Sequence, residues 1–133
     1  YIDGSGDTIA EDLAHVGMRV ERIDDATLAA GDLGRYRAIV VGIRAYNTRS
    51  ALRRAHERLV GFAERGGTVV VQYMTNSEWD PLPGPVGPYP LQIGRGRVTD
   101  EGAVMRAVAA AEPLLAAPNR IGAGDFDGWV QER

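Results

Sequence analysis

The chain has 133 residues, of which 44% are hydrophobic and 25% charged, and its formal net charge is -3. This length allows one domain with a hydrophobic core, and the acidic balance argues against nucleic acid as a partner. The sequence contains no cysteine, and all 15 basic residues are arginine. A disulfide, a thiolate metal site, a cysteine nucleophile and a lysine Schiff base are therefore excluded. No apolar run approaches the roughly 18 residues of a membrane span.

Strands and helices are expected to alternate through the first half of the chain. In order, the pattern predicts a strand end at residues 1–2, a helix over about 8–16, a strand over 18–23, a short helix or turn over 26–34, a strand over 38–43, a helix over about 50–65 and a strand over 68–73. The run at 38–43 is continuously apolar and the run at 68–73 has three consecutive valines, a pattern typical of strands buried on both faces. This order predicts an α/β fold with a doubly wound parallel sheet.

Sequence signals also place the ends and inner faces of the predicted helices. Asp7 or Thr8 is expected to cap the first helix, and Gly17 to follow its end. The helix over 50–65 is expected to turn one apolar face to the core, formed by Leu52, Leu59, Val60 and Ala63. The glycine pair at 66–67 is expected to end that helix.

The amino-acid composition of the chain changes after residue 80. Residues 81–90 hold five of the seven prolines, which predicts an irregular loop over about residues 80–97. Short strands are expected at 91–93 and 97–99, and an Ala-rich helix over 104–115 that ends near Pro113. The chain begins at Tyr1, which is expected to lie inside a strand, with no initiator methionine and no signal peptide. We expect a single domain, 1–133, excerpted from a longer protein and beginning inside its first strand.

Ligands of open α/β sheets bind outside the carboxyl ends of the strands. The residues that follow the predicted parallel strands are therefore expected to line one ligand pocket: Gly4, Gly6, Asp7, Arg44, Tyr46, Asn47, Gln72 and Tyr73. In this pocket Arg44 would supply charge for an anionic or polyhydroxyl ligand. Asn47 and Gln72 would supply orienting hydrogen bonds. Tyr46 or Tyr73 would supply a stacking face.

Two parts of this predicted pocket have alternative interpretations. The Gly4-Ser5-Gly6-Asp7 string is either a phosphate cradle, with Asp24-Asp25 at the position of a ribose-binding acid, or a tight turn capped by Asp7. An aspartate would repel phosphate, which favours the turn. Arg44 either binds a ligand or pairs with an acidic residue such as Asp7.

Catalytic and metal-binding signals are weak. The turn after residues 68–73 offers Tyr73 or Met74, neither of which is an acyl-transfer nucleophile, so a non-catalytic turn is expected. His15 and His56 stand on predicted helices without the spacing of metal ligands and are interpreted as structural. Near the end of the chain, Asp125, Asp127 and Trp129 either cap the pocket and stack on a sugar, or the tryptophan anchors the tail.

Several strings in the chain are similar to one known family. They are Val40-Val41-Gly42-Ile43-Arg44-Ala45-Tyr46-Asn47-Thr48-Arg49, Gly66-Gly67-Thr68-Val69-Val70-Val71-Gln72-Tyr73, Gly87-Pro88-Tyr89-Pro90, Arg97-Val98-Thr99-Asp100-Glu101 and Asp125-Phe126-Asp127-Gly128-Trp129-Val130-Gln131-Glu132-Arg133. Together they resemble the C-terminal domain of large bacterial PIG-L/LmbE-type proteins, of the N-acetylglucosaminyl deacetylase family. The resemblance implies a class I glutamine amidotransferase-like fold, which is flavodoxin-like. One string departs from that family, in which His-Pro usually stands where this chain has Glu112-Pro113.

The same resemblance implies a parent protein with a separate zinc-dependent deacetylase domain. The His-Pro-Asp-Asp motif of that domain is absent from this chain, so zinc is expected only in the parent's deacetylase domain and no cofactor in this segment. The amidotransferase triad is absent too, because no cysteine follows Tyr73 and no His-x-Glu pair lies downstream.

The expected function is therefore that of a non-catalytic accessory or ligand-binding domain. Its expected partners are the deacetylase domain of the same parent chain and a sugar-like small molecule. Two alternatives stay open: a purely structural docking or oligomerisation module, and a hydrolase that uses Asp7, Asp125 or Asp127.

Overall fold

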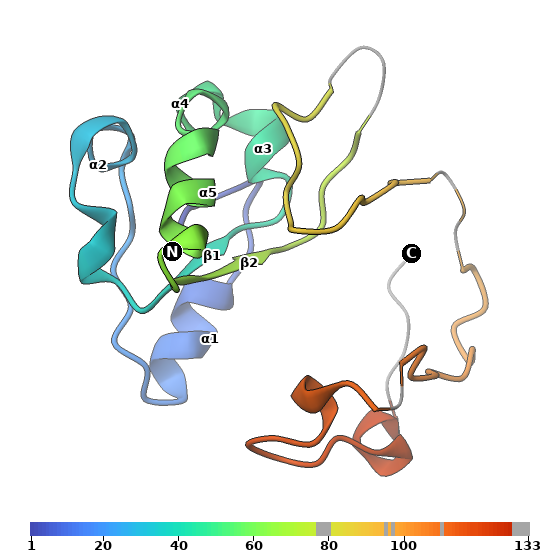
Figure 1. The fold of residues 1–133 in the computed structure, drawn as a ribbon. Helices are drawn as coiled ribbons and strands as arrows, with labels where there is room; N and C mark the ends of the chain where they lie inside the picture. Colours follow the sequence, from blue (N-terminus) through green and yellow to red (C-terminus); the bar gives the residue numbers. More distant parts are fainter. Residues whose placement is uncertain (77–80, 95, 97, 110, 129–133) are drawn as a thin grey trace. The chain divides into compact units, whose positions relative to one another are not determined.

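The structure is a computed structural model that describes residues 1–76, 81–94, 96, 98–109 and 111–128 (Figure 1). The chain divides into two compact units, Tyr1–Ile93 and Gly94–Arg133. The helices and strands of the first unit are α1 (Ile9–His15), α2 (Asp25–Ala30), η1 (Leu33–Arg35), β1 (Ala38–Val41), α3 (Ala45–Thr48), α4 (Ser50–Arg54), α5 (His56–Glu64) and β2 (Thr68–Val71). In Figure 1, α4 and α5 are drawn above the two strands and α1 below them.

The sheet of the first unit is small and parallel. β1 pairs with β2 in a register that sets Ile39 opposite Val69. On the other side of β1, Ile2 forms a parallel bridge with Val41. Beyond it, the N-terminal ammonium of Tyr1 donates to Glu21 O at 2.7 Å and the N–H of Ile23 donates to Tyr1 O at 2.8 Å, in the pattern of parallel neighbours. The extended segments therefore follow the order 21–23, 1–2, β1, β2.

Two expectations about the strands need correction. Residues 18–23 form no strand, since their bonds to an extended neighbour are limited to the two with Tyr1, Met18 bonds back to Leu13, and most of their side chains are exposed. β2 is not buried on both faces: Thr68 is exposed, Val69 and Val71 are half-buried, and Val70 is 48% exposed. The reason is position, because β2 is the outermost strand of the described sheet and its Val70 face is not covered.

The core of the first unit joins the sheet to the helices. It is a cluster of buried side chains, chiefly Ile2, Ile23, Leu28, Leu33, Ile39, Val41, Leu52, Leu59 and Phe62. The helix expected over 50–65 is interrupted at Ala55, where α4 ends and α5 begins. Of its expected inner face, Leu52 and Leu59 are buried and Val60 is half-buried, but Ala63 is exposed. Phe62 continues the apolar stripe of Leu59 instead.

The second unit has little regular structure in its described part. It contains two short 3-10 helices, η2 (Pro113–Leu115) and η3 (Ala123–Phe126). The helix expected over 104–115 is not formed by the described residues, and Val104 and Val108 are exposed. Alanine content alone does not hold a short helix, which needs an apolar face packed against a neighbour. Residues 91–93 and 98–99 are not strands either, and Arg97 lies outside the described residues.

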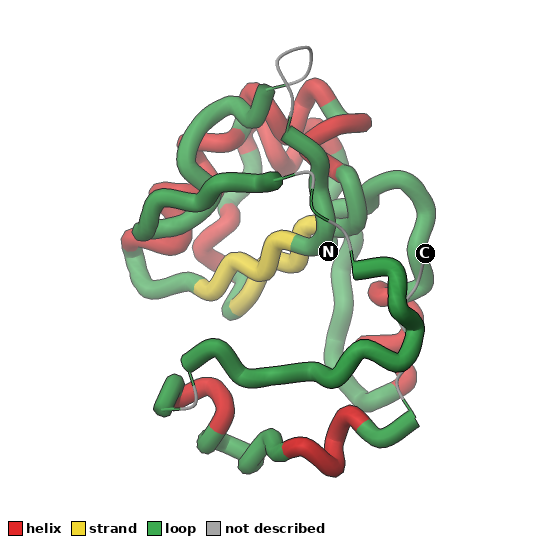
Figure 2. Tube along the Cα trace, turned by 90° about the vertical axis from the view of Figure 1, so that its right-hand side faces the viewer, coloured by secondary structure: helices red, strands yellow, loops and turns green. Residues whose placement is uncertain are grey.

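Loops account for most of the described chain outside the first unit's helices, and the short β1–β2 pair supplies the strands (Figure 2). Among the described residues, no helix is both long and apolar enough to cross a membrane.

Candidate functional site

The loops that leave the carboxyl ends of the parallel segments meet at one edge of the sheet. The N–H of Ser5 donates to Ile43 O at 2.8 Å, which ties the first loop to the loop after β1. The N–H of Arg44 donates to Tyr73 O at 2.7 Å, which ties that loop to the turn after β2. The structure thus brings together the three loops that hold the predicted pocket residues. We call this place the carboxyl edge, formed by residues 3–7, 42–47 and 72–75.

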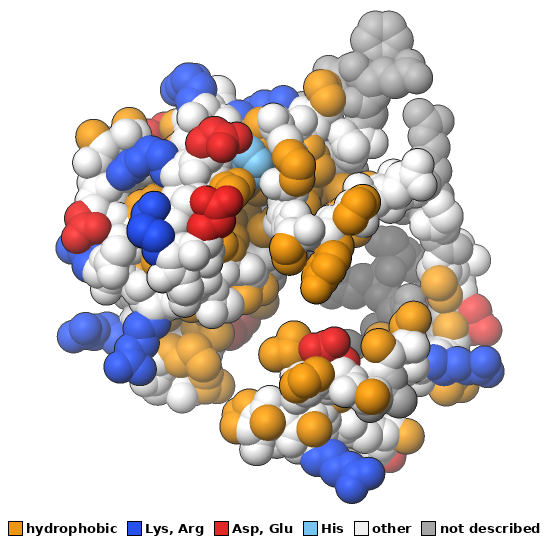
Figure 3. All heavy atoms as spheres, in the orientation of Figure 1, with side chains coloured by type: hydrophobic (Ala, Val, Ile, Leu, Met, Phe, Trp, Pro, Cys, Tyr) orange, Lys and Arg blue, Asp and Glu red, His pale blue; other side chains and the backbone are white. Residues whose placement is uncertain are grey.

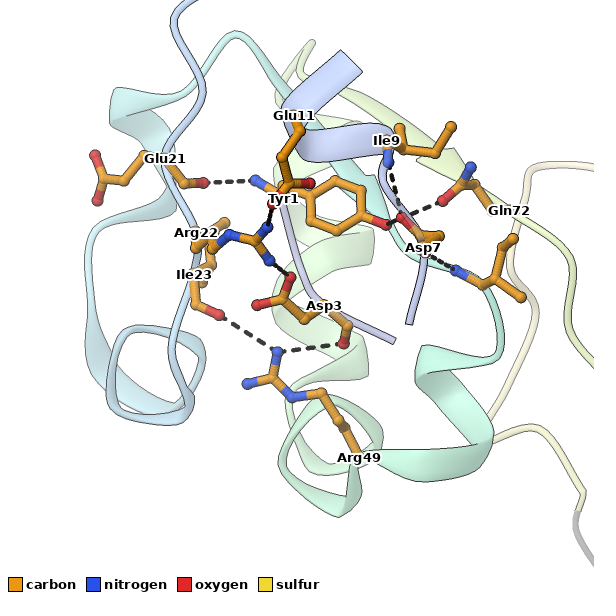
Figure 4. A network of polar contacts seen from close by, with 11 residues as sticks. Tyr1, Asp3, Asp7, Ile9, Glu11, Glu21, Arg22, Ile23, Arg49 and Gln72 are labelled. Atoms are coloured by element: carbon orange, nitrogen blue, oxygen red, sulfur yellow. Dashed lines mark hydrogen bonds and ion pairs between the residues drawn. The ribbon is translucent and has the colours of Figure 1, made fainter. Parts of the chain in front are cut away.

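Asp7 is the centre of a hydrogen-bond network at the carboxyl edge (Figure 4). Its carboxylate accepts from the Tyr1 hydroxyl, from the N–H of Ile9 at 3.1 Å and from the N–H of Ile43 at 3.2 Å. Gln72 Oε1 lies 3.3 Å from the same tyrosine hydroxyl. Asp7 therefore caps the turn into α1 and holds the loop after β1. Since its carboxylate occupies donors that a phosphate would need, this geometry favours the turn over the phosphate cradle.

The network also perturbs the acidity of its members. Burial raises the pKa of Asp7, but the hydrogen bonds from Tyr1, Ile9 and Ile43 outweigh it, so the pKa lies below the usual value. Burial and the bond to Asp7 raise the pKa of the Tyr1 hydroxyl, which remains a donor at neutral pH.

Glycine at position 4 is required by close approach of two backbones. A Cβ on Gly4 would lie 2.0 Å from Ile43 O. Gly42 lies on the other side of this approach: a Cβ on Gly42 would lie 2.9 Å from Gly4 N and 2.5 Å from the Tyr1 hydroxyl oxygen. Gly6 is different, because it is exposed, has open space around it and needs glycine for its φ of +95°.

Asn47 and Gln72 serve mainly to join the loops. The Asn47 amide donates to Thr75 O at 2.9 Å and accepts from the Thr75 N–H at 3.1 Å. This two-way bond fixes the turn after β2, in which Met74 is buried.

The side chain of Tyr46 is turned into the core and does not face the carboxyl edge, contrary to the predicted stacking role. Its side chain is 2% exposed and lies in the core. Its hydroxyl is 3.0 Å from His56 Nδ1, and the two rings meet edge-on with centroids 5.7 Å apart. Burial raises the pKa of Tyr46 to about 12. The stacking face at the edge is left to Tyr73, which is 59% exposed.

Arg44 is held in an unusual backbone conformation. Its φ is +56°, in the left-handed region, where a side chain other than glycine costs about 1–2 kcal/mol. Its side chain is exposed and forms no hydrogen bond or ion pair with the described residues. The alternative pairing with Asp7 is not formed, because the Asp7 carboxylate is occupied by Tyr1, Ile9 and Ile43.

Replacing Arg44 with glycine is expected to leave the domain about 1 kcal/mol more stable than replacing it with alanine. Both variants lose the guanidinium group, but only glycine relaxes at a φ of +56°. Urea unfolding of the two variants, followed by circular dichroism, measures the difference. Equal stability of the two would contradict the left-handed conformation.

A hollow of about 380 Å³ adjoins the carboxyl edge, and most of the residues around it are charged. It is lined by Asp3, Gly4, Arg22, Ile23, Asp24, Asp25 and Arg49. Arg49 pairs with Asp25 and reaches Ile23 O at 3.4 Å, while Arg22 pairs with Asp3 and Glu11 (Figure 4 shows both arginines).

The acids predicted for a ribose are likewise engaged in the fold. Asp24 caps α2 by accepting from the Thr27 N–H at 2.8 Å, and Asp25 pairs with Arg49. Arg49 was not among the predicted site residues. Its place in the similar string at residues 40–49 was the signal that could have found it.

The predicted pocket cap belongs to the second unit. Asp125 accepts from the Gly122 N–H at 2.7 Å and Asp127 is exposed, while Trp129 lies outside the described residues. Across the described parts of both units, no group of three or more His, Asp or Glu side chains could hold a metal ion.

Comparison with known proteins gives no relative. No protein-family model, no curated protein and no solved structure matches the chain.

Proposed function

We propose that this chain is a non-catalytic, ligand-binding accessory domain of a PIG-L/LmbE-type deacetylase, with a flavodoxin-like, class I glutamine amidotransferase-like fold. The observation that carries the proposal is Arg44, an exposed guanidinium on a left-handed backbone at the carboxyl edge. Strained residues cluster at functional sites, where the surrounding structure holds them in place. Here the bonds of the Arg44 backbone to Tyr73 and Asn47 do so.

The order of the extended segments supports the proposed fold. Of these segments β1 and β2 are strands, and the spatial order 21–23, 1–2, β1, β2 matches the 2-1-3-4 part of a flavodoxin-like sheet. In a sheet of that order the chain adds strands first on one side of the first strand and then on the other, starting with the third. Ligands bind between the first and third strands, outside their carboxyl ends. Arg44 follows the third of these segments.

The hydrogen bonds that Asp7 accepts support a domain without catalysis. Asp7, the carboxylate expected for a hydrolase at this edge, accepts three hydrogen bonds within the fold. The turn after β2 supplies Met74 and a Thr75 whose N–H is bonded to Asn47. Both features weigh against the hydrolase alternative.

The accessible groups suggest a carbohydrate-like ligand. Arg44 offers donors to hydroxyl or carboxylate oxygens, and Tyr73 offers an exposed aromatic face. The backbone bond of 2.7 Å between these residues keeps them adjacent. Zinc would belong to the parent's deacetylase domain, and that domain would receive the ligand presented here.

Thermal unfolding in the presence of amino sugars and N-acetylated sugars tests the proposal. A ligand at 100 times its Kd stabilises the native state by about 2.7 kcal/mol, and a bound sugar is expected to raise Tm accordingly. Arg44→Ala should abolish this shift. Arg54→Ala, which removes the same charge from an exposed position on α4, should leave the shift intact.

The absence of a shift with every sugar would overturn the ligand-binding role. A docking role is the second candidate, and Val70 favours it, since this apolar side chain is 48% exposed on β2.

A further inference from the structure

A cavity of about 510 Å³ lies in the first unit, beside α5 and β2. It lies between α5, β2 and the segment Pro85–Pro88, and its lining is largely apolar, with Leu59, Val60, Val69, Val71 and Val86 among it. Cavities of this size and character hold small organic ligands when a few polar groups fix their orientation. The polar groups of this cavity are therefore decisive.

His56 supplies the buried polar group. Its side chain is 3% exposed and lines the cavity. Nδ1 is 3.0 Å from the Tyr46 hydroxyl, whereas Nε2 has no hydrogen-bond partner in the described part of the chain. Buried polar atoms are nearly always bonded, and Nε2 is an unpartnered atom of a ring that lines the cavity, so it is the group that a ligand entering there can satisfy.

The Tyr46 bond sets the role of that nitrogen. We assign the Tyr46 hydroxyl as the donor to Nδ1, because Nδ1 is its partner among the described residues and the hydroxyl proton would otherwise be buried without an acceptor. In the neutral imidazole the hydrogen then resides on Nε2, which becomes a donor. The missing partner is therefore an acceptor. The Gly84 backbone lies over Nε2, and a Cβ there would be 3.0 Å away.

Charge at the cavity limits the class of acceptor. Glu57 and Glu64 line it, and both are exposed. In Figure 3 acidic and hydrophobic side chains meet beside a histidine on this face of the first unit. Two carboxylates oppose an anionic ligand, which leaves a neutral oxygen as the acceptor.

We propose that this cavity binds a small, neutral and mainly apolar molecule whose carbonyl or ether oxygen accepts a hydrogen bond from His56 Nε2. The site does not share Arg44 or Tyr73 with the proposed carbohydrate site, so either can fail without the other.

Acetophenone and ethylbenzene are matched probes, because they have nearly the same shape and only acetophenone carries an accepting oxygen. Calorimetric titration of the whole chain is expected to show acetophenone binding about fivefold more tightly, the contribution of one hydrogen bond. The chain has two histidines, so the ring nitrogens are readily distinguished by ¹⁵N NMR. Acetophenone should shift His56 Nε2 and leave the exposed His15 unchanged.

Two variants test the contact directly. His56→Gln keeps an N–H near the position of Nε2 and should keep the preference for acetophenone. The double variant Tyr46→Phe with His56→Phe leaves no unpaired hydroxyl and should bind both probes equally. Equal affinity of the two probes for the unaltered chain, or no binding of either, would overturn the proposal. The NMR shift decides the question on the unaltered chain if a variant does not fold.

Discussion

Replacing Gly4 with alanine is expected to destabilise the first unit by about 3 kcal/mol, the upper part of the range for overpacking. The added Cβ would lie 2.0 Å from Ile43 O and 2.9 Å from Gly42 C. These are backbone atoms, and Ile43 is held on both sides by its bonds to Ser5 and Asp7. The contact cannot be relieved by a side-chain rotation, so the loop that carries Arg44 must move.

Gly6→Ala is the matched control for that variant. Gly6 lies two residues away and has no atom within 4 Å of its Cβ position, so its cost is limited to a φ of +95°. We expect about 1 kcal/mol for this strain. Urea unfolding separates the two effects, and a Gly4→Ala variant no less stable than Gly6→Ala would contradict the close approach of the two loops.

Asp7→Ala is expected to cost about 3 kcal/mol, the second large effect. The substitution leaves the Tyr1 hydroxyl and the N–H groups of Ile9 and Ile43 without their acceptor, and each unsatisfied donor costs about 1–3 kcal/mol where it is buried. Because Asp7 and its surroundings are only partly buried, water can satisfy part of these donors, and the total cost is smaller than the sum of three fully buried ones. Asp12→Ala is the control, because this exposed aspartate on α1 accepts one bond, from Thr8, and should cost less than about 1 kcal/mol.

The same carboxylate predicts how stability depends on pH. The pKa of Asp7 is lowered in the folded state, so its stabilisation is fully present above the unfolded value of about 3.9 and is lost as the pH falls through the folded value. We expect the stability difference between the unaltered chain and Asp7→Asn to be constant above about pH 5 and to shrink toward pH 2. Urea midpoints measured across this range test it, and a difference that does not change with pH would show that Asp7 is not the titrating group.

Local patterns predicted the elements whose signals are contained in neighbouring residues. The β-branched runs predicted β1 and β2. The glycine pair at 66–67 predicted the end of α5, and Gly66 follows that helix with a φ of +93°. The exposure of Val70 was not predictable in this way. It depends on which strand is outermost and on which face the helices leave uncovered.

At the site, the rule for parallel strands correctly placed three loops together but not the direction of each side chain. The left-handed turn at Arg44 starts α3 at once, and this turn carries Tyr46 into the core rather than to the edge. His56 was missed as a cavity residue because its surroundings come from Tyr46, Gly84 and the Pro85–Pro88 segment, which no local spacing connects.

Titration of the ¹⁵N-labelled chain with N-acetylglucosamine, followed through its backbone amide signals, tests the proposed ligand-binding role most directly. The account predicts saturable shifts at Arg44, Ala45 and Tyr73, and their loss in Arg44→Ala but not in Arg54→Ala. Shifts that are absent at these amides, or that persist unchanged in Arg44→Ala, would contradict it.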